Sequence, residues 1–327
     1  MIDCYTRPEA IAEINRLGQQ DEPFIFVIDY EGEKSYVKRL SEVNSEEVRY
    51  AFGKWNNGAC EAQEKGQVKW EIQPEAAEVY RKKFEKVQRE LNAGNTFLIN
   101  LTCRIPVSTN LSLLDIYTRS SARYRLWMKD RLVCFSPEIF IRISQGKISG
   151  YPMKGTIDAK MDHAEEVLMA DGKEAAEHAT IVDLIRNDLS IVAQRVTVPR
   201  YRYVDHLQTH SGEILQTSSE VRGELRPGYR AHLGDLLFSQ LPAGSITGAP
   251  KKKTVEIIAE AEDYQRGFYT GVMGICERGC MDSAVMIRYV EMEDGKMYFK
   301  AGGGITARSE WENEYKEVIQ KAYVPIY

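Results

Sequence analysis

The sequence predicts an α+β fold, organised as one compact unit with two intimately packed halves. Three observations carry this prediction. Long strand-like runs are interspersed with a few long helix-like segments. The regular strand–helix–strand rhythm of a doubly wound parallel sheet is missing. No internal repeat, low-complexity tract or Pro/Gly-rich linker divides the 327 residues, 43% of which are hydrophobic and supply a sizeable core.

The composition excludes several classes of protein. A net charge of −5 argues against a basic nucleic-acid binder. The first residues, MIDCYTRPEA, lack the pattern of a secretory signal, and no apolar run approaches the ~18 residues that span a bilayer. Six cysteines are scattered without a CxxC pair, so we expect neither a disulfide framework nor a zinc site. We therefore expect a cytoplasmic protein without a nucleic-acid or membrane partner.

Strand signals precede the first long predicted helix. Residues 23–37 predict two strands joined by a Glu-Gly turn, and the polar segment 42–66 predicts a loop. A helix is predicted from Pro74 to Gly94, because apolar residues recur there at helical spacing between a proline start and a glycine stop. The segment 95–105 then predicts another strand.

The middle of the chain continues the alternation. A second helix is predicted over 111–121, and several strands follow within 131–153. One long helix is predicted from Asp162 to Asn187. Segment 191–222 predicts a mixture of strand and loop.

The C-terminal part returns to strands between two helices. A helix is predicted to start near Ala249–Pro250. Two strands are expected within 269–290 and a third over 295–302. The last helix begins near Ser309, because Ser309 and Glu312 have the spacing of a capping box.

Two segments contain residues that suit a nucleophile or a divalent cation. Lys154 lies between Pro-Met and Gly-Thr in YPMKGTI, where a solvated turn lysine is the alternative interpretation. Glu174 and Glu177 are three residues apart on the predicted long helix, so they share one face. Paired carboxylates can hold Mg²⁺, which prefers oxygen ligands, but a solvated helix face fits them as well.

Two further segments are rich in glycine. In LPAGSITGAPKKKTVEII, free N–H groups at a helix start favour an anion, but the spacing does not match a nucleotide phosphate loop. In FKAGGGITARSEWENEYKEVIQKA, the successive glycines let a ligand approach the backbone closely. The helix after them carries a stripe of Glu310, Glu314, Glu317 and Lys321. This stripe fits either a metal site or a solvated face with a Glu317–Lys321 ion pair.

Arg288 alternates onto the same predicted strand face as Ala284, Met286 and Val290. An arginine on an apolar face needs a partner, which is either a bound carboxylate or an internal Asp or Glu. Taken together, two carboxylate pairs, an arginine, a glycine-rich backbone and an unusual lysine suit a small polyanionic substrate bound through Mg²⁺.

Eight stretches match one known family in the same order: FLINLTCR, SPEIF, YPMKGTI, AEHATIVDLIRNDLS, GSITGAPK, GFYTGVMG, VMIRY and AGGGITARSEWENEYKEVIQK. On these motifs the chain resembles the chorismate-utilising enzymes. The family includes component I of aminodeoxychorismate synthase and of anthranilate synthase, and the isochorismate and salicylate synthases. The resemblance implies two packed antiparallel β-sheet halves with outer helices and the active site between them. It also implies one catalytic domain over 1–327, with a shortened N-terminal part over 1–90 and the family core over 91–327.

Two positions indicate the branch of the family. The Pro-x-Lys-Gly-Thr form around Lys154 looks like component I of aminodeoxychorismate synthase, since anthranilate and isochorismate synthases generally carry alanine there. Isochorismate and salicylate synthases place a water-activating lysine where this chain has Leu98. The resemblance therefore implies conversion of chorismate and ammonia to 4-amino-4-deoxychorismate, the precursor of 4-aminobenzoate and folate. The alternatives are component I of anthranilate synthase and a noncatalytic chorismate-binding homologue.

The resemblance also implies roles for individual residues. Lys154 would add to C2 of the chorismate ring as the C4 hydroxyl leaves, which requires a pKa lowered from about 10.4. Glu138, as general acid/base, would protonate that hydroxyl and needs a pKa raised by burial. His206 matches the family's active-site histidine. The Mg²⁺ ligands correspond to four glutamates, of which the last two hold waters: Glu177, Glu317, Glu174 and Glu314.

A further set of residues corresponds to the family's substrate-binding groups. Those that bind carboxylates are Arg288, Tyr269, Lys321 and the amides of Gly303 and Gly304. The wall near the ring corresponds to Ser245, Thr247 and Gly248. No cysteine-nucleophile signature of a glutaminase is found, so the resemblance implies that a separate glutamine amidotransferase subunit supplies the ammonia. Longer members of the family bind tryptophan through an N-terminal segment with a Leu-Leu-Glu-Ser-type element. No such element is found in the N-terminal part of this chain, so the resemblance does not imply a tryptophan site.

Overall fold

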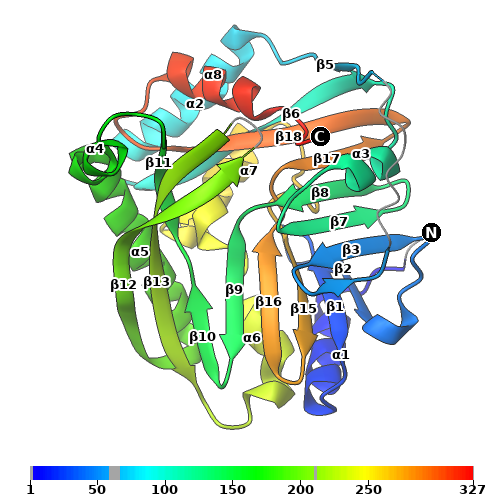
Figure 1. The fold of residues 1–327 in the computed structure, drawn as a ribbon. Helices are drawn as coiled ribbons and strands as arrows, with labels where there is room; N and C mark the ends of the chain where they lie inside the picture. The colour runs from blue at the N-terminus through cyan, green and yellow to red at the C-terminus, as the bar shows by residue number, and fades with distance from the viewer. Residues whose placement is uncertain (1–2, 59–66, 210–211, 327) are drawn as a thin grey trace.

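The computed structural model of the protein describes residues 3–58, 67–209 and 212–326. Within these ranges, the strands form two nine-stranded sheets, and neighbouring strands pair antiparallel throughout (Figure 1). The first sheet has the order β11-β13-β10-β9-β16-β15-β1-β2, with β12 on the other edge of β13. The second has the order β14-β6-β18-β17-β8-β7-β3-β4, with β5 beside β6. The predicted pair of antiparallel halves is confirmed.

The strands of the first sheet are β1 (Phe24–Ile28), β2 (Ser35–Arg39), β9 (Ile139–Ser144), β10 (Lys147–Gly150), β11 (Met153–Asp158), β12 (Ala193–Thr209), β13 (Gly212–Leu225), β15 (Val272–Glu277) and β16 (Cys280–Val285). The strands of the second sheet are β3 (Val48–Phe52), β4 (Trp55–Asn56), β5 (Trp70–Ile72), β6 (Leu98–Thr109), β7 (Tyr124–Met128), β8 (Leu132–Ser136), β14 (Gly248–Ala249), β17 (Tyr289–Glu293) and β18 (Lys296–Ile305).

The α-helices are α1 (Arg7–Gln19), α2 (Ala77–Asn92), α3 (Leu113–Arg119), α4 (Ala164–Ala170), α5 (Gly172–Val192), α6 (Leu233–Ser239), α7 (Lys251–Ala261) and α8 (Trp311–Lys321). Short 3₁₀ turns are η1 (Leu40–Glu42), η2 (Tyr229–His232) and η3 (Gly244–Ile246).

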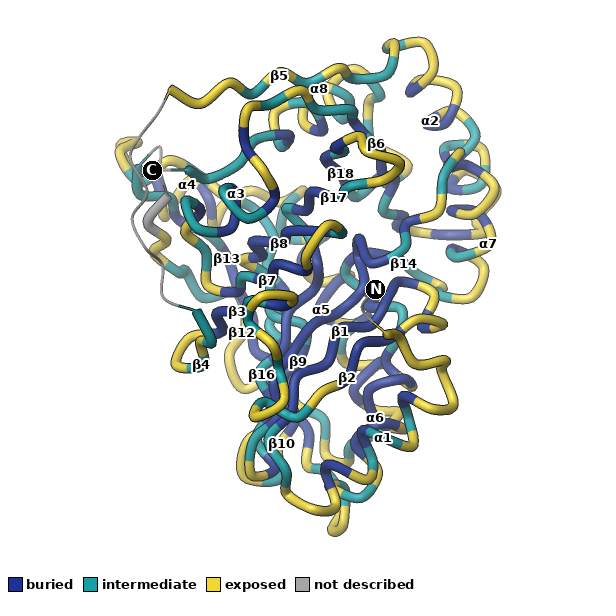
Figure 2. Tube along the Cα trace, turned by 90° about the vertical axis from the view of Figure 1, so that its right-hand side faces the viewer, coloured by how far each residue is buried: buried dark blue, intermediate teal, exposed yellow. Residues whose placement is uncertain are grey.

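Three large apolar clusters hold four layers together: one set of helices, the second sheet, the first sheet and the other set of helices. One cluster lies between the sheets and draws side chains from both, such as Ile25 of β1 and Leu126 of β7. A second joins the outer face of the second sheet to α2, α3, α7 and α8. The third joins the first sheet to α1, α5 and α6. Figure 2 shows the result: buried strands inside and helices whose outer faces are exposed. The helices therefore cover the sheets from outside, as expected.

The structure departs from the sequence prediction in the N-terminal part. Residues 7–19 form α1, for which no helix was predicted, although the N-cap Thr6 and Glu9 in the first turn make a capping box. The predicted loop over 42–66 is wrong for its described part, because β3 and β4 lie there. Strand β3 alternates its side chains into the cluster between the sheets, which supplies the stabilisation that its local sequence does not indicate. Residues 59–66 lie outside the described residues.

The long predicted helix is broken into α4 and α5. Asp171 ends the first and caps the second, because its Oδ1 accepts hydrogen bonds from the amides of Lys173 and Glu174. The capping box predicted for the last helix is also absent. Glu310 is the N-cap of α8, and the hydroxyl of Ser309 instead accepts a hydrogen bond from the amide of Thr306. Helix α6 and strands β5, β7 and β14 were not predicted either.

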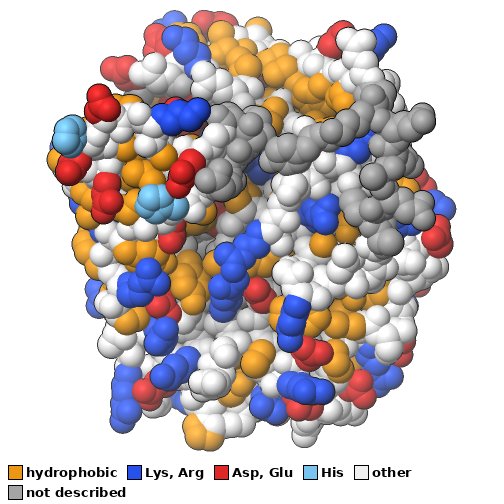
Figure 3. Space-filling model, viewed as in Figure 1, with side chains coloured by type: hydrophobic (Ala, Val, Ile, Leu, Met, Phe, Trp, Pro, Cys, Tyr) orange, Lys and Arg blue, Asp and Glu red, His pale blue; other side chains and the backbone are white. Residues whose placement is uncertain are grey.

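The described surface has a mixed character. On the face seen in Figure 3, lysine and arginine side chains are interspersed with aspartate and glutamate. None of the helices that the structure describes combines the length and the apolar character needed to cross a lipid bilayer.

Candidate functional site

A small cavity of about 160 Å³ lies between the two sheets. Most of the residues expected to bind substrate line it. Its wall consists of Asn100, Glu138, Ser245, Ile246, Tyr269, Ile287, Arg288, Phe299, Lys300, Ala301, Gly302, Gly303, Gly304 and Lys321. Polar groups from strands of the second sheet and from the segments that join the two sheets thus converge on one concave site, which is the usual form of a small-molecule site.

The polar wall of the cavity is made where the chain passes from one sheet to the other. Glu138 lies on the crossing from β8 to β9, and Ser245 on the crossing from β13 to β14. Tyr269 lies between β14 and β15, and Arg288 between β16 and β17. Residues far apart in the sequence therefore meet, because each crossing spans the same gap between the sheets.

Glu138 is held by two serines. Its amide donates to Ser136 Oγ at 3.1 Å, which orients the start of the crossing. Its Oε1 accepts a hydrogen bond of 2.6 Å from Ser245 Oγ. Burial raises the pKa of Glu138, although the Ser245 hydrogen bond and the charge of Lys321 act in the opposite direction. The raised pKa expected for a general acid is therefore present.

Arg288 reaches the cavity in a different way from the one predicted. It does not alternate with Ala284 and Met286 along a strand, because β16 ends at Val285 and β17 starts after Arg288. Its φ of +54° turns the chain between the sheets. Its Nη1 donates to the carbonyl oxygen of Lys321 at 3.1 Å. The guanidinium thus has a backbone partner and also lines the cavity, where it suits a carboxylate.

The glycine-rich segment presents an open strand edge to the cavity. Strand β17 pairs with β18 only from Tyr289, opposite Lys300, onward, so Gly302–Gly304 have a strand partner on the β6 side alone. Lys321 Nζ donates to the Gly302 carbonyl at 3.0 Å. A Cβ on Gly303 would lie 3.3 Å from Glu314 Oε2, so glycine lets helix α8 approach the strand. These three glycines line the cavity, so a ligand bound there would lie next to their backbone.

Helix α8 brings two carboxylates to this edge. Glu317 Oε1 lies 2.6 Å from Lys321 Nζ. Burial alone would raise the pKa of Glu317, but the charge and hydrogen bond of Lys321, with the charges of Lys154 and Arg288, lower it overall. Burial raises the pKa of Glu314, and the negative charge of Glu317 adds to the effect. The stripe on α8 keeps features of a solvated face, because it contains the Glu317–Lys321 ion pair and 53% of the Glu317 side chain is exposed. Glu310 is exposed as well, whereas Glu314 is half-buried.

Lys154 lies on β11 beside the carboxylates of α5. Its Nζ is 2.7 Å from Glu177 Oε2. Gly155 follows in a β-bulge with φ of +78°, and a Cβ there would lie 3.2 Å from Glu174 Oε2. Glycine is thus required both by the backbone conformation and by the approach of Glu174. Glu177 contacts Lys154 directly, and the charge of Glu174 also acts on it.

The pKa of Lys154 shifts in the direction opposite to the prediction. Burial acts to lower it, but the hydrogen bond and charge of Glu177, with the charges of Glu174 and Glu317, raise it overall. The lysine is therefore held as an ammonium ion in this structure. It does not line the small cavity, and its link to the cavity is Glu317, which binds Lys321 in the cavity wall.

The four glutamates surround Lys154 without forming a compact ligand set. Among the described residues, no three His, Cys, Asp or Glu side chains are grouped closely enough to hold a metal ion. Glu174 Oε2 is nevertheless buried without a hydrogen-bond partner. An unsatisfied buried carboxylate oxygen next to further carboxylates is chemically suited to a hard cation.

Besides Lys154 and the four glutamates, three further predicted residues do not line the cavity. Thr247 is buried, and its hydroxyl donates to the Ala243 carbonyl at 2.8 Å, within its own loop. Gly248 allows β14 to approach β6, because a Cβ would lie 1.8 Å from the Leu98 carbonyl oxygen. His206 lies on β12 with 63% of its side chain exposed, and its Nδ1 is 2.8 Å from Glu213 Oε1.

Two other residues near the site were not predicted. Asn100 lines the cavity, and its Oδ1 is buried without a hydrogen-bond partner among the described residues. His178, next to Glu177, is fully buried, and its Nε2 lies 2.6 Å from Ser219 Oγ. An asparagine in a strand and a histidine in a helix carry no distinctive sequence signal, so these two residues are recognised only by their surroundings in the structure.

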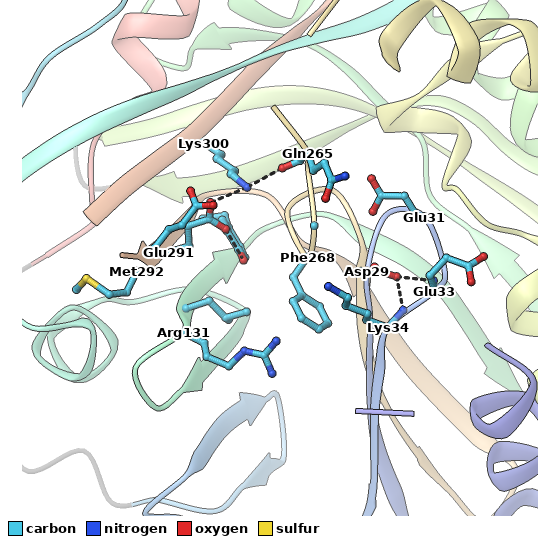
Figure 4. Close-up of a pocket in the computed structure, with 14 residues that line it drawn as sticks. Asp29, Glu31, Glu33, Lys34, Arg131, Gln265, Phe268, Glu291, Met292 and Lys300 are labelled. Carbon is cyan, nitrogen blue, oxygen red and sulfur yellow. Dashed lines mark hydrogen bonds and ion pairs between the residues drawn. The ribbon is translucent and has the colours of Figure 1, made fainter. Parts of the chain in front are cut away.

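A larger cavity of about 470 Å³ lies behind Lys300. Figure 4 shows Lys300 reaching Glu291 and the backbone of Gln265 there, while Asp29 accepts hydrogen bonds in the β1–β2 turn. Lys300 is the single described residue that lines both cavities. The larger cavity contains none of the residues predicted for the site, so the smaller one is the better candidate.

Comparison with known proteins identifies the family of the chain. A family model described as a chorismate binding enzyme matches residues 3–326. An uncharacterised PabA-like protein of Pasteurella multocida is 46% identical over 327 residues, covering 97% of this chain and 98% of the relative. Aminodeoxychorismate synthase component 1 of Klebsiella aerogenes is 32% identical over 259 residues, covering 75% of this chain and 56% of the relative.

A solved structure has a similar fold. Anthranilate synthase component I from Streptococcus pneumoniae superposes with a TM-score of 0.68 and 30% identity. The match covers 77% of this chain and 58% of that one. The chain therefore belongs to the family of chorismate binding enzymes, and the cavity between its sheets is the candidate site of a chorismate-utilising enzyme.

Proposed function

We propose that the protein converts chorismate and ammonia to 4-amino-4-deoxychorismate. The observation that carries the proposal is the position of Lys154, which lies among four glutamates next to the cavity. At the place where water-activating relatives carry a lysine, this chain has Leu98, whose Cδ1 would lie 3.4 Å from a Cβ on Gly304. An apolar group there offers no base for an attacking water.

In the proposed reaction, Lys154 Nζ forms a bond to C2 of the ring while the C4–oxygen bond breaks. Glu138 gives its proton to the departing hydroxyl, which leaves as water. Ammonia then forms a bond to C4, and the bond between Lys154 and C2 breaks. The lysine must first exchange its contact with Glu177 for the ring and lose a proton, because its raised pKa keeps it charged in this structure.

The other cavity residues orient the substrate. Arg288 and Lys321 place positive charge where the two carboxylates of chorismate would lie, and the open edge of β18 adds backbone N–H groups. Tyr269 is buried against Tyr289, with ring centroids 5.7 Å apart, and forms a rigid wall. These groups act by binding and orientation.

We propose Mg²⁺ as the cofactor, held by Glu177 and Glu317 with Glu174 and Glu314 beside them. The unsatisfied Glu174 oxygen and the oxygen-rich surroundings fit this ion. When bound, Mg²⁺ would supply positive charge for a substrate carboxylate and compete with Lys154 for Glu177.

We also propose that a separate glutamine amidotransferase subunit delivers the ammonia. The chain itself shows no glutaminase signature, and the PabA-like names of its relatives in Pasteurella and Haemophilus support this assignment. Ammonium salts should replace that subunit in a test tube, because the proposed nucleophile is free ammonia.

Product identification tests the proposal. Protein incubated with chorismate, Mg²⁺ and ammonium should give 4-amino-4-deoxychorismate by mass spectrometry, and nitrogen-15 ammonium should shift the product by one mass unit. Lys154→Ala should reduce turnover at least about a hundredfold, because the nucleophile is lost. Lys173→Ala, at an exposed lysine at the start of α5, serves as the matched control and should keep full activity.

Other products would overturn the assignment. Anthranilate would identify the anthranilate synthase branch, and isochorismate would show that water attacks despite Leu98. Binding of chorismate without turnover, with ammonium and Mg²⁺ present, would identify a noncatalytic homologue.

A further inference from the structure

A buried ion pair ties helix α5 to the loop that carries Ser245. Asp188 lies near the end of α5 and is 9% exposed. Its Oδ1 is 2.9 Å from Nζ of Lys251, the first residue of α7. Lys251 Nζ also donates to the carbonyl oxygen of Gln240 at 3.1 Å. The pair therefore joins α5 to both ends of the segment 240–251.

This segment fits tightly against α5 next to the ion pair. A Cβ on Gly244 would lie 2.8 Å from Asp188 Oδ2. The next residue, Ser245, donates its 2.6 Å hydrogen bond to Glu138. Asp188, Gly244, Ser245 and Glu138 also line one small cavity of about 20 Å³. A backbone shift at Gly244 would therefore displace the Ser245 hydroxyl.

We propose that the Asp188–Lys251 ion pair positions the Ser245 hydroxyl on Glu138, so that Asp188 and Lys251 are positioning residues of the reaction. Neither residue lines the 160 Å³ cavity, so the effect passes through the backbone of the segment 240–251. The inference rests on the proposed function for its kinetic readout. Its structural readout is independent of turnover.

The effect on Glu138 has a defined sign. Burial raises its pKa, and the Ser245 hydrogen bond lowers it. Loss of that bond should therefore raise the pKa of Glu138 further. The other titratable groups that line the two cavities beside Glu138 stay in place: Tyr269, Arg288, Lys300 and Lys321 on one side, and Tyr151 on the other.

Two substitutions separate positioning from a direct charge effect. Lys251→Met removes a positive charge and Asp188→Asn a negative one, but both break the ion pair. If the pair acts by positioning, both variants raise the pKa of Glu138. A direct effect of charge would raise it in the first variant and lower it in the second. Carbon-13 NMR of glutamate labelled at the side-chain carboxyl measures this pKa, with the signal assigned by Glu138→Gln.

A double-mutant cycle gives the kinetic test. Ser245→Ala and Lys251→Met should each lower kcat about tenfold, the order expected for one lost hydrogen bond to a charged group. The double variant should also lose about tenfold rather than a hundredfold, because both changes remove the same bond. Lys251→Arg keeps the ion pair and should restore the wild-type rate and pKa.

Lys83 provides a matched control. Its Nζ lies 2.7 Å from Glu75, and the two side chains are 10% and 18% exposed, comparable to the Asp188–Lys251 pair. Neither residue lines the 160 Å³ cavity. Lys83→Met should lower the melting temperature, leave the pKa of Glu138 unchanged and combine multiplicatively with Ser245→Ala.

Opposite pKa shifts in Lys251→Met and Asp188→Asn, or multiplicative losses with Ser245→Ala, would overturn the positioning role. If Lys251→Met does not fold, the isosteric Asp188→Asn decides alone: a raised pKa supports the role and a lowered one excludes it. If the wild-type protein forms no product, the proposed function fails, while the NMR titration still decides the role of the ion pair.

Discussion

Glu138 illustrates how a buried carboxyl group that suits a general acid can lower the free energy of unfolding of the protein. Burial raises its pKa above the ordinary value of 4.5. Between that value and the raised one, the unfolded chain has lost the proton while the folded protein still carries it. Folding then takes up a proton, so the stability falls as pH rises through this window. Above the raised pKa, the folded protein contains a partly desolvated carboxylate.

We predict that Glu138→Gln, which cannot ionise, melts with the wild-type protein near pH 4 and at a higher temperature above pH 7. Each unit of pKa shift corresponds to about 1.4 kcal/mol of stability. The difference should grow through the window and then level off. Calorimetry from pH 4 to 8 measures it. Glu33→Gln, at a side chain that is 65% exposed, is the control and should show no such trend. A pH-independent difference for Glu138→Gln would contradict the prediction.

Lys154 marks the limit of prediction for a single residue. Its unusual neighbours Pro-Met and Gly-Thr identify it as a site residue. Its protonation state depends on Glu177 from α5 and Glu317 from α8. A sequence pattern does not give the distance between these elements, so the direction of the pKa shift could not be predicted. The same reason explains why His206 was expected at the cavity and lies outside it.

Among the secondary-structure elements, the break between α4 and α5 shows what helical periodicity leaves undecided. The residues on both sides favour a helix, so the sequence predicts one long helix. The chain ends α4 at Asp171, whose carboxylate then caps the first turn of α5. Asp171 lies within a continuous helical pattern, so the sequence alone does not show that one helix ends there and another begins. Strands β3 and β7 were missed as well; they pair with each other, and β3 also pairs with β4 and β7 with β8.

Asp171→Ala tests the importance of this cap. We predict a loss of about 1 kcal/mol in the free energy of unfolding, as for other N-caps. Because Glu174 lies in the uncapped turn, the variant should also bind Mg²⁺ several-fold more weakly. Ser112→Ala is the matched control, because Ser112 caps α3 with a hydrogen bond of 3.1 Å from the amide of Asp115. Urea titration and calorimetric Mg²⁺ titration separate the two effects. Equal Mg²⁺ affinity in both variants would exclude a role for the cap in the metal site.

At the scale of the whole molecule, the route of the chain builds the site. The chain passes between the sheets from β2 to β3, β8 to β9, β13 to β14, β14 to β15 and β16 to β17. The four polar cavity residues described above lie on the last four of these crossings. Local patterns predict the strands but not the sheet to which each strand belongs. Residue periodicity by itself therefore indicated no more than the α+β class. The paired sheets and most of the site followed from the order of the family motifs.

These crossings also predict how the molecule unfolds. The apolar cluster between the sheets contains Ile25 and Ile275 from the first sheet and Leu126 and Leu132 from the second. Unfolding of either sheet would expose the packed face of the other. Because the chain crosses repeatedly between the sheets, unfolding of one sheet should also destabilise the other. We therefore predict one cooperative transition in urea, in spite of the size of the chain.

The chain offers probes for each sheet. Its four tryptophans lie on β4, β5, β7 and α8, which all belong to or pack on the second sheet. Cys276, only 2% exposed, lies on β15 of the first sheet, and Cys134 lies on β8 of the second. The loss of tryptophan fluorescence and the thiol labelling of both cysteines, resolved by mass spectrometry, should share one urea midpoint. Labelling of Cys276 at lower urea than Cys134 would show instead that the first sheet unfolds on its own. The cavity between the sheets would then be lost before the second sheet unfolds.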